Sequence, residues 1–364
     1  MWLFSKHGDD VGDNAFAFYK YVKNKHPEIR CVYVADANRH EEWKKVCAVG
    51  EVVQFRSREH KNLFMRADKI ITSHVGDSEP WSYEKVKKIR ERFPDWAKKH
   101  KIIHLQHGVI DKNVTHIYSK KLRPVDLFIS STVDEKRYIE QTLGYKTEQV
   151  PCTGLARFDD LFGGEKEKII LLIPRYRRDV MVQLPENKIK LKYHFTNTEF
   201  FIKYQDLMVD DGLSKMLDKY DYKLYFYPHY EVQPLIRCFY KKSDRIFIVD
   251  RSQITLDELL KKSALMITDY SSVAFDFAYM RKPVIYYQFD KDAFDVEYGG
   301  SYFKHEQDGF GPVVQTKEEC LLEVQRYMDG KFDPMGIYRR RCEKIFPKYD
   351  DKNCERIYER IMAL

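Results

Sequence analysis

Residues 265–290 constrain the fold most, because they contain a strand, a helix and a second strand within one short run. A short apolar run ends at Thr268, and residues 284–287 form a second run that is rich in β-branched and aromatic side chains. The residues between them have helical character, with Arg281 and Lys282 expected in the last turn before Pro283 stops the helix. This order predicts one unit of a parallel sheet.

The same alternation continues along the chain. Further strands are expected at 2–5, 31–35, 52–55, 69–73, 102–106 and 127–131, and then at 169–173, 224–227 and 246–249. Helices are expected at 14–25, 199–219, 255–263, 272–281 and 317–329. Alternating strands and helices predict an α/β protein with parallel, doubly wound sheets.

A chain of 364 residues is too long for one ordinary hydrophobic core, so two domains are expected. Residues 154–165 end in a Gly-Gly pair beside charged residues, and the alternation of strands and helices restarts at Ile169. We therefore assign residues 1–162 to one domain and residues 163–333 to a second. Residues 334–364 are expected to form a helical segment that packs back across the domains.

Composition narrows the functional class. The seven cysteines are scattered and form no CxxC pair, which favours a reducing, cytosolic compartment and suggests no metal site. The longest aliphatic run, 169–173, is far shorter than the ~20 residues of a membrane-spanning helix. The net charge of +7 is modest, but residues 85–123 contain twelve Lys and Arg against three acidic residues. This basic segment lacks a recognisable nucleic-acid-binding motif, so no nucleic acid is expected as a partner.

Residues 81–101 combine a basic face with an apolar stripe at helical spacing, formed by Val86, Ile89, Phe93 and Trp96. Pro94 is expected to break or kink this helix. Two interpretations stay open: the segment could bind an anionic membrane surface, or its stripe could cover the core of its own domain.

Two hydroxyl residues, Ser271 and Ser272, follow the strand at 265–268 and stand at the expected helix N-terminus. They either cap this helix or, with its backbone N–H groups, bind an anion such as phosphate.

Two histidines follow strands in a similar way. His107 and Gly108 come directly after the strand at 102–106, and His229 follows the strand at 224–227. A neutral imidazole can accept a proton at working pH, and a glycine lets the backbone approach a ligand closely. His104, three residues before His107, is expected to pack within the sheet.

Three arginines, Arg175, Arg177 and Arg178, follow the strand at 169–173. Guanidinium groups at a strand end suit a pyrophosphate, although a solvated basic loop is the alternative. For Arg157 and Asp159, beside the expected domain boundary, a salt bridge or a turn is the simpler explanation.

The candidate residues share one position, the carboxyl end of a parallel strand. Ligands of open α/β sheets bind at these ends, which in a two-domain protein line the cleft between the domains. The shared position predicts an enzyme acting on a phosphorylated or nucleotide-activated substrate.

The motifs at these strand ends are specific in combination. They are TDYSS with FDFA, KP and FD within 268–290, QHG at 106–108, GLARFD at 154–159, PRYRRD at 174–179, PH at 228–229 and GPVV at 311–314. Together they resemble the CDP-glycerol glycerophosphotransferases, the family of the teichoic acid primases and polymerases. The resemblance extends over most of the chain.

The resemblance implies a GT-B architecture, in which two Rossmann-like domains have parallel sheets facing a central cleft. It implies transfer of glycerol phosphate from CDP-glycerol to a hydroxyl of a cell-wall or capsular polymer, or of a lipid-linked acceptor, with release of CMP. Residues 1–162 would form the acceptor side and residues 163–333 the CDP-donor side. The expected location is cytoplasmic and peripheral, at the inner face of the cell membrane.

The sequence departs from the family pattern at two places. Tyr176 replaces a tryptophan, and residues 109–111 read Val-Ile-Asp where the primases and polymerases have Thr-Pro-Leu. The loop after His107 is expected to touch the acceptor, so the acceptor stays open. The chain begins directly in a strand, so it is expected to be an excised catalytic region of a longer enzyme.

Roles follow for the catalytic residues under this resemblance. His107 is assigned as the general base that activates the acceptor hydroxyl, an effect worth roughly 10²–10⁴ in rate. His229 and Arg177 are expected to hold the pyrophosphate and to offset charge in the transition state.

Roles for the substrate-binding residues follow in the same way. Ser271 and Ser272 are expected to bind the donor phosphate, and Gly108 to lie against the substrate. Asp269 is counted among these residues, although it is expected to fix its loop by accepting backbone N–H bonds. No cofactor is required in this scheme, and a requirement for Mg²⁺ is left open.

Three alternatives are kept. The donor could be CDP-ribitol, or the enzyme could be a GT-B glycosyltransferase that uses a sugar nucleotide. A third alternative, of a different class, is a non-catalytic module that binds an anionic polymer or membrane through residues 85–123.

Overall fold

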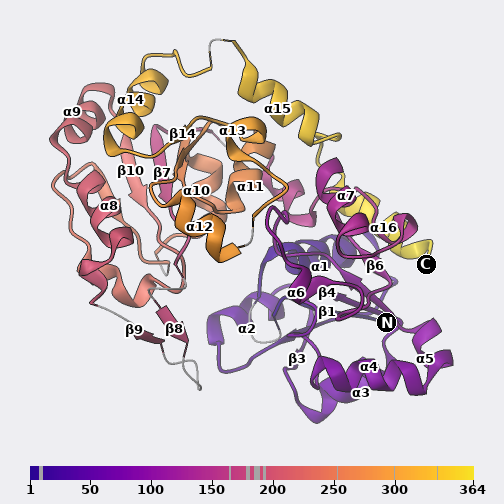
Figure 1. Ribbon diagram of the computed structural model, residues 1–364. Helices are drawn as coiled ribbons and strands as arrows, with labels where there is room; N and C mark the ends of the chain where they lie inside the picture. Colours follow the sequence, from indigo (N-terminus) through magenta and orange to yellow (C-terminus); the bar gives the residue numbers. More distant parts are fainter. Residues whose placement is uncertain are drawn as a thin grey trace. The chain divides into compact units, whose positions relative to one another are not determined.

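The computed structural model describes residues 1–7, 11–163, 165–177, 181–183, 189–191, 194–251, 253–298, 300–333 and 335–364. The chain forms two compact units (Figure 1). Unit 1 contains Met1–Asp160 and Ile345–Leu364, and unit 2 contains Leu161–Lys344. From the sequence, the boundary was expected after residue 162, two residues later than in the structure, and residues 334–364 were expected to form one segment. The structure instead divides that segment between the two units.

Unit 1 is built on a parallel sheet that has six strands in the described part of the chain, in the order β3-β2-β1-β4-β5-β6. The strands are β1 Trp2–Ser5, β2 Cys31–Ala35, β3 Glu51–Gln54, β4 Lys69–Thr72, β5 Lys101–His104 and β6 Leu127–Phe128. The helices are α1 Asp13–Lys25, α2 His40–Cys47, α3 Arg58–Arg66, α4 Tyr83–Arg92, α5 Pro94–Lys99, α6 Thr115–Tyr118, α7 Val133–Gln141 and α16 Asn353–Met362.

The two faces of this sheet carry separate hydrophobic clusters, because successive side chains of a strand point to opposite faces. Phe4 packs with Phe18 of α1 and Ile357 of α16 on one face. Leu3 packs with Phe64 of α3 and Val86 of α4 on the other. Figure 1 shows α1 and α16 beside this sheet, although they come from opposite ends of the chain.

Unit 2 repeats the arrangement, with six parallel strands in its described residues in the order β11-β10-β7-β12-β13-β14. The strands are β7 Ile169–Ile173, β10 Lys223–Phe226, β11 Ile246–Ile248, β12 Leu265–Thr268, β13 Val284–Tyr287 and β14 Val313–Val314, with an antiparallel pair of β8 Met181–Gln183 and β9 Ile189–Leu191. The helices are α8 Glu199–Met208, α9 Asp211–Tyr220, α10 Leu256–Lys262, α11 Val273–Tyr279, α12 Lys291–Tyr298, α13 His305–Asp308, α14 Lys317–Met328 and α15 Ile337–Ile345, whose last residue is counted with unit 1.

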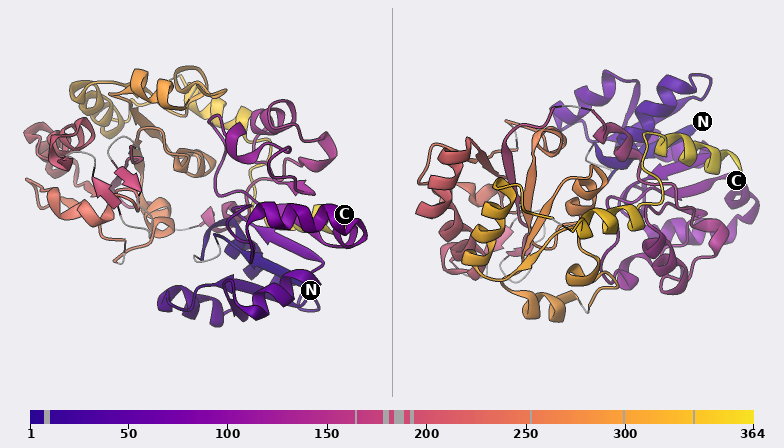
Figure 2. Two further views of the ribbon diagram at one scale, coloured as in Figure 1. Left: turned by 60° about the horizontal axis from the view of Figure 1, so that its bottom comes forward. Right: turned by 90° about the horizontal axis from the view of Figure 1, so that it is seen from above.

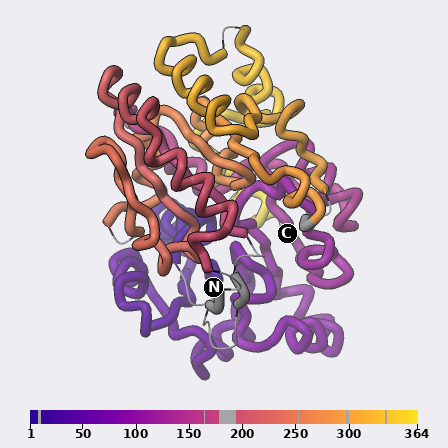
Figure 3. Tube along the Cα trace, turned by 60° about the vertical axis from the view of Figure 1, so that its left-hand side comes forward, coloured from indigo at the N-terminus to yellow at the C-terminus, as the bar shows by residue number. Residues whose placement is uncertain are grey.

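One face of the second sheet is covered by α8, α9 and α14, which lie side by side in Figures 1 and 3. Tyr204 of α8 and Leu217 of α9 pack there on Ile170 and Leu172 of β7. The views in Figure 2 show helices flanking the strands of each unit.

Both sheets have the Rossmann strand order, in which the first strand of a unit lies between the second and the fourth. The predicted α/β class and its parallel sheets are therefore confirmed. The switch points lie between β1 and β4 and between β7 and β12, and ligands of such sheets bind at the carboxyl ends there. A cleft between the units stays a prediction.

The basic amphipathic segment is divided by Pro94, as expected, into α4 and α5. Val86 is fully buried in the core of unit 1, and the Trp96 indole N–H donates to the Met65 carbonyl at 2.9 Å. Phe93, by contrast, is 50% exposed. Most of the apolar stripe therefore covers the core of its own unit. Lys88, Arg92 and Lys99 are exposed, whereas Arg90 is paired with Asp126.

The single helix expected at 199–219 is wrong, because two helices occupy this region. The break falls at Asp210, whose carboxylate accepts a hydrogen bond from the Leu213 N–H at 3.0 Å and caps α9. An aspartate before a helical run is a known start signal, so the sequence did contain this information.

No helix among the described residues is both long enough and apolar enough to cross a membrane.

Candidate functional site

His107 lies just beyond the carboxyl end of β5, where its side chain is exposed and the following Gly108 is buried. The His107 ring stacks on the ring of His74, which follows β4, with centroids 4.6 Å apart and planes 21° apart. His7, which follows β1, meets His74 edge to face at 5.3 Å. Burial, and then the neighbouring His107, lower the pKa of His74 well below its ordinary value. Three neighbouring strand ends thus bring three imidazoles together at the switch point of unit 1.

The backbone on either side of His107 is fixed by residues from distant segments. The Asn14 side-chain amide donates to the Gln106 carbonyl at 2.8 Å. The Arg157 guanidinium donates to the His107 carbonyl and to Asp13, each at 2.5 Å. The salt bridge expected for Arg157 is therefore present, and it also holds the turn that carries His107.

The other expectations for this region have mixed outcomes. His104 packs within the sheet as expected, with its ring stacked on Phe128 at 4.6 Å. Asp159 accepts hydrogen bonds from the backbone N–H groups of Asn353 and Cys354 and so caps α16. The side chains of residues 109–112, expected to touch the acceptor, are buried and at most 8% exposed. They shape the loop from inside, so their part in acceptor choice stays a prediction.

Arg177, after β7 in unit 2, is 6% exposed and bonded to two carboxylates. Its Nε and Nη2 donate to the two oxygens of Asp290 at 2.6 and 3.1 Å. Its Nη1 donates to Asp269 and to the Arg175 carbonyl, both at 2.8 Å. These contacts occupy most of the guanidinium donors inside the protein. We therefore correct the role expected for Arg177, because it fixes the loops at this strand end and does not present a free guanidinium to a pyrophosphate.

Asp269 is fully buried at the end of β12. Its Oδ1 accepts from the backbone N–H groups of Arg175 at 2.9 Å and Tyr270 at 2.6 Å, while the Tyr204 hydroxyl donates to Oδ2 at 3.1 Å. The predicted loop-fixing role is confirmed. A direct contact of this carboxylate with a substrate is not supported by its burial.

His229 lies beyond β10, between the rings of Tyr176 at 4.6 Å and Tyr230 at 4.3 Å. The Glu231 backbone N–H donates to Nδ1 at 3.3 Å, so a neutral His229 carries its proton on Nε2. Burial, followed by the charges of Arg175 and Arg251, lowers the pKa of His229 to about 3. At neutral pH His229 can therefore donate a hydrogen bond from Nε2, but it carries no positive charge.

Ser271 and Ser272 precede α11, which begins at Val273, and both are partly exposed. Ser271 Oγ accepts from the Val273 N–H at 3.4 Å, whereas the N-cap residue Ser272 makes no capping bond with its side chain. The two hydroxyl groups thus contribute little to capping α11, and their binding of phosphate stays a prediction.

Lys282 was expected in the last turn of this helix, which is wrong because α11 ends at Tyr279. Its ammonium group donates to the carbonyls of Leu260 at 2.7 Å and Lys261 at 2.5 Å, at the end of α10. Burial lowers the pKa of Lys282 to about 8. Lys282 therefore stabilises the C-terminus of a different helix.

The sequence prediction missed one cation of this edge, Arg251, which follows β11. Its Nε lies 3.3 Å from the Tyr227 hydroxyl, and its guanidinium is 5.8 Å from the centre of the Tyr230 ring. Its position just after a strand was a usable signal. Arg175 is partly exposed, and Arg178 lies outside the described residues.

A family model described as CDP-glycerol:poly(glycerophosphate) glycerophosphotransferase matches residues 1–363. The chain belongs to this family. The resemblance drawn from the strand-end motifs is therefore confirmed, and the family is one of transferases.

Curated relatives come from teichoic acid synthesis. The minor teichoic acid biosynthesis protein GgaB of Bacillus subtilis (strain 168) is 30% identical over 100% of this chain and 40% of that protein. A teichoic acid poly(ribitol-phosphate) polymerase of Bacillus spizizenii is 24% identical over 67% of this chain and 38% of that protein. This chain thus spans about two fifths of the length of these relatives.

Solved structures share the fold of this family member. A structure of the wall teichoic acid polymerase TagF, in a histidine-substituted variant, has a TM-score of 0.73 at 18% identity and covers 100% of this chain and 88% of that chain. A putative UDP-N-acetylglucosamine 2-epimerase from Listeria monocytogenes has a TM-score of 0.61 at 14% identity and covers 100% and 96%. These similarities confirm the expected GT-B fold class.

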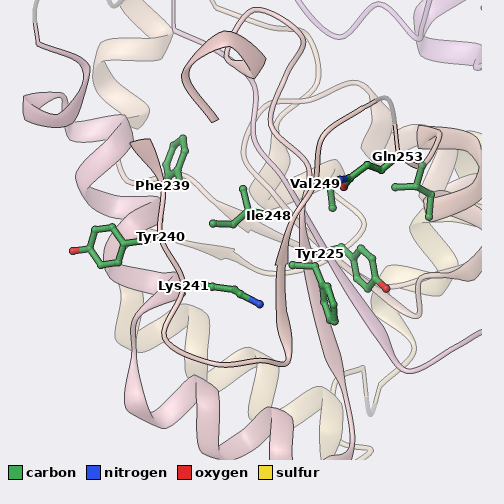
Figure 4. A pocket seen from close by; sticks show the side chains of 9 residues that line it. Tyr225, Phe239, Tyr240, Lys241, Ile248, Val249 and Gln253 are labelled. Atoms are coloured by element: carbon green, nitrogen blue, oxygen red, sulfur yellow. The ribbon is translucent and has the colours of Figure 1, made fainter. Parts of the chain in front are cut away.

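A hollow of about 580 Å³ lies at the edge of the second sheet, where Figure 4 shows Tyr225, Tyr240 and Lys241 among its lining residues. It includes none of the predicted site residues. Among the described residues, no group of three or more His, Cys, Asp or Glu side chains is placed to hold a metal ion.

Replacing Arg177 by methionine is expected to destabilise unit 2 by about 3–5 kcal/mol, because the buried Asp269 and the partly buried Asp290 would lose their cation. Arg175→Met, at a partly exposed position in the same loop, should change stability by less than about 1 kcal/mol. Native-state hydrogen exchange of the β12 amides measures this, since all four tryptophans lie in unit 1. Equal protection in the two variants would contradict the structural role of Arg177.

His229 is expected to stay neutral, with its proton on Nε2, until the pH falls to about 3. The unfolded chain takes up this proton near the ordinary value of 6.5, so His229 stabilises the fold above pH 6.5, and this contribution is lost as the pH falls from 6.5 towards 3. A ¹⁵N NMR titration of the imidazoles measures both features, with exposed His40 as reference. A titration midpoint for His229 near 6.5 would contradict its enclosure.

Proposed function

We propose that this chain transfers glycerol phosphate from CDP-glycerol to a hydroxyl of a cell-wall or capsular polymer and releases CMP. The match of the glycerophosphotransferase family model to residues 1–363 carries this proposal. The exposed His107, which follows β5 beside the Rossmann switch point of unit 1, supports it, because this position is open to a ligand and can accept a proton.

In the proposed reaction, the acceptor oxygen forms a bond to the phosphorus that bears glycerol. The bond from this phosphorus to the bridging oxygen of the pyrophosphate breaks, and its electron pair leaves with CMP. The hydroxyl proton passes to His107, whose turn is held by Arg157 and Asn14. Fixing the base in this way supports the reaction, since proton transfer requires hydrogen-bond geometry.

CMP gains negative charge as it leaves. We propose that groups at the carboxyl edge of the sheet of unit 2 stabilise this charge. Arg175 and Arg251 supply positive charge there in place of Arg177, and His229 donates a hydrogen bond from Nε2. Ser271 and Ser272 add hydroxyl groups beside the start of α11. Donors fixed in advance stabilise developing charge without reorganisation, so these groups are suited to the transition state. A requirement for Mg²⁺ stays open.

The acceptor is proposed to be a growing polymer or its lipid-linked precursor at an anionic membrane surface, on the cytoplasmic side. The basic segment at 85–123 supports this partner through charge. The structure limits how it would bind, because Val86 and Trp96 are used in the core of unit 1. We therefore propose electrostatic attachment and not insertion of the α4 stripe.

A CDP-ribitol donor is the second candidate, and the 24% identity to a poly(ribitol-phosphate) polymerase favours it. A panel of CDP-glycerol, CDP-ribitol and UDP-sugars offered to the same acceptor separates the donors. Turnover of a UDP-sugar alone would replace the proposal by the glycosyltransferase alternative.

His107→Ala is expected to lower the rate of CMP release by about 10²–10⁴, because the acceptor hydroxyl loses its general base. The measurement follows CMP from CDP-glycerol in the presence of a lipid-linked or short polymer acceptor. His116→Ala removes an exposed histidine of the same unit and should keep the wild-type rate. A His107→Ala enzyme with near wild-type turnover would remove the base role.

Binding to vesicles that contain anionic lipid is expected to fall as salt rises. Replacing Lys88, Arg92 and Lys99 by glutamine should weaken it by about 10²-fold, at about 1 kcal/mol for each exposed cation. Arg90 is left in place, because it donates to Asp126 at 2.9 Å.

Flotation with vesicles measures this binding. The control variant replaces the exposed Lys215, Lys219 and Lys331 of unit 2 by glutamine, which removes the same charge from another surface. Equal losses in the two variants would show a nonspecific effect of net charge, and no flotation of the wild type would remove the membrane partner.

A further inference from the structure

Three helices in the described part of the chain, α7, α10 and α14, begin with the same local sequence pattern, Thr-x-x-Glu, which is typical of a capping box. In α14 the box closes in both directions. The Glu319 N–H donates to Thr316 Oγ1 at 3.2 Å, and the Thr316 N–H donates to Glu319 Oε2 at 3.1 Å. In α7 the Glu135 N–H donates to Thr132 Oγ1 at 3.1 Å, but no capping box forms. The Glu135 carboxylate points elsewhere.

Glu135 is fully buried, and its carboxylate holds the loop that carries His107. Oε1 accepts from the Ile110 backbone N–H at 2.6 Å and from the Gln106 side-chain amide at 3.1 Å. Oε2 accepts from the Ser131 backbone N–H at 2.7 Å and from the Ser131 hydroxyl at 3.0 Å. One carboxylate therefore bonds the loop on both sides of His107 and anchors it to the residues after β6.

The loop and the carboxylate depend on each other. Gln106 has a φ of 63°, a left-handed conformation that costs a residue with a side chain about 1 kcal/mol or more. The bonds from its amide to Glu135 and to the Ile129 carbonyl, the latter at 2.5 Å, offset this strain. Burial raises the pKa of Glu135 to about 7, whereas the hydrogen bonds from Ser131 and Ile110 lower it. A glutamine in place of Glu135 would have the same shape, but its amide N–H groups would face at least one of the groups that donate to the carboxylate.

We propose that Glu135 is a positioning residue, which sets the direction of the His107 side chain by clamping residues 106 and 110. The inference rests on the proposed function in one respect, the role of His107 as the base. Glu135 itself has no contact with the reacting atoms in this scheme, so it acts through His107.

The test compares Glu135→Gln with Glu319→Gln, the matched change in a capping box far from His107 in the sequence. Glu135→Gln is expected to lower kcat for CMP release by about ten- to a hundredfold, because small misplacements of a catalytic group have effects of this size. The KM for CDP-glycerol should stay within about twofold, and Glu319→Gln should keep the wild-type kcat. In the His107→Ala background, Glu135→Gln should cause no further loss.

A second readout does not depend on activity. In protein labelled with ¹³C at histidine Cε1, Glu135→Gln should shift or broaden the His107 resonance and leave that of His229 unchanged. If Glu135→Gln does not fold, Glu135→Asp replaces it, since the shorter side chain retracts the carboxylate from the loop. The circular dichroism spectrum of each variant checks the fold.

The outcomes separate the two proposals. A wild-type protein that releases no CMP from any donor, with the His107 resonance still dependent on Glu135, overturns the proposed function and supports the clamp. A wild-type protein that releases CMP, with Glu135→Gln equal to Glu319→Gln in kcat and in the His107 resonance, overturns the clamp alone. A full additional loss in the His107→Ala background also overturns it.

Discussion

The pairing of Arg177 with Asp269 and Asp290 is the interaction on which the candidate site of unit 2 depends. It joins the residues after β7, β12 and β13, three neighbouring strands, through hydrogen bonds of 2.6–3.1 Å. Buried charges are tolerated only when they are paired and bonded, so this network fixes the loops that surround it. Arg175, beside it, is thereby placed at the partly exposed surface of the same edge.

Unit 1 uses the same principle with a different residue. A buried carboxylate, Glu135, accepts two hydrogen bonds from the loop around His107 and two from Ser131 after β6, and Arg157 bonds to the His107 carbonyl. In both units, charged residues close to a family motif organise the backbone, while more exposed residues such as His107 and Arg175 lie beside them.

Much of the fold could be predicted, because apolar runs and helical spacing are local signals. Four strands of each unit begin at the expected residue, whereas the short β14 and the pair β8 and β9 were missed for lack of a long apolar run. For the candidate site, the sequence predicted only which residues follow the strands. Whether a side chain there is exposed, like His107, or enclosed, like Arg177, depends on contacts with residues about 50 to 113 positions away.

The sequence by itself determined the class of the protein, since the order of strands and helices and the spacing of its motifs are properties of the chain alone. It also determined the family, with His107, His229, Ser271 and Ser272 at the ends of strands. Only the tertiary structure decided the roles of Arg177, Lys282 and Glu135. The sequence pattern of Lys282 and Glu135 fits a local partner, and that of Arg177 fits an anionic ligand. Folding instead brings a distant partner within hydrogen-bond reach of each, and burial strengthens that contact.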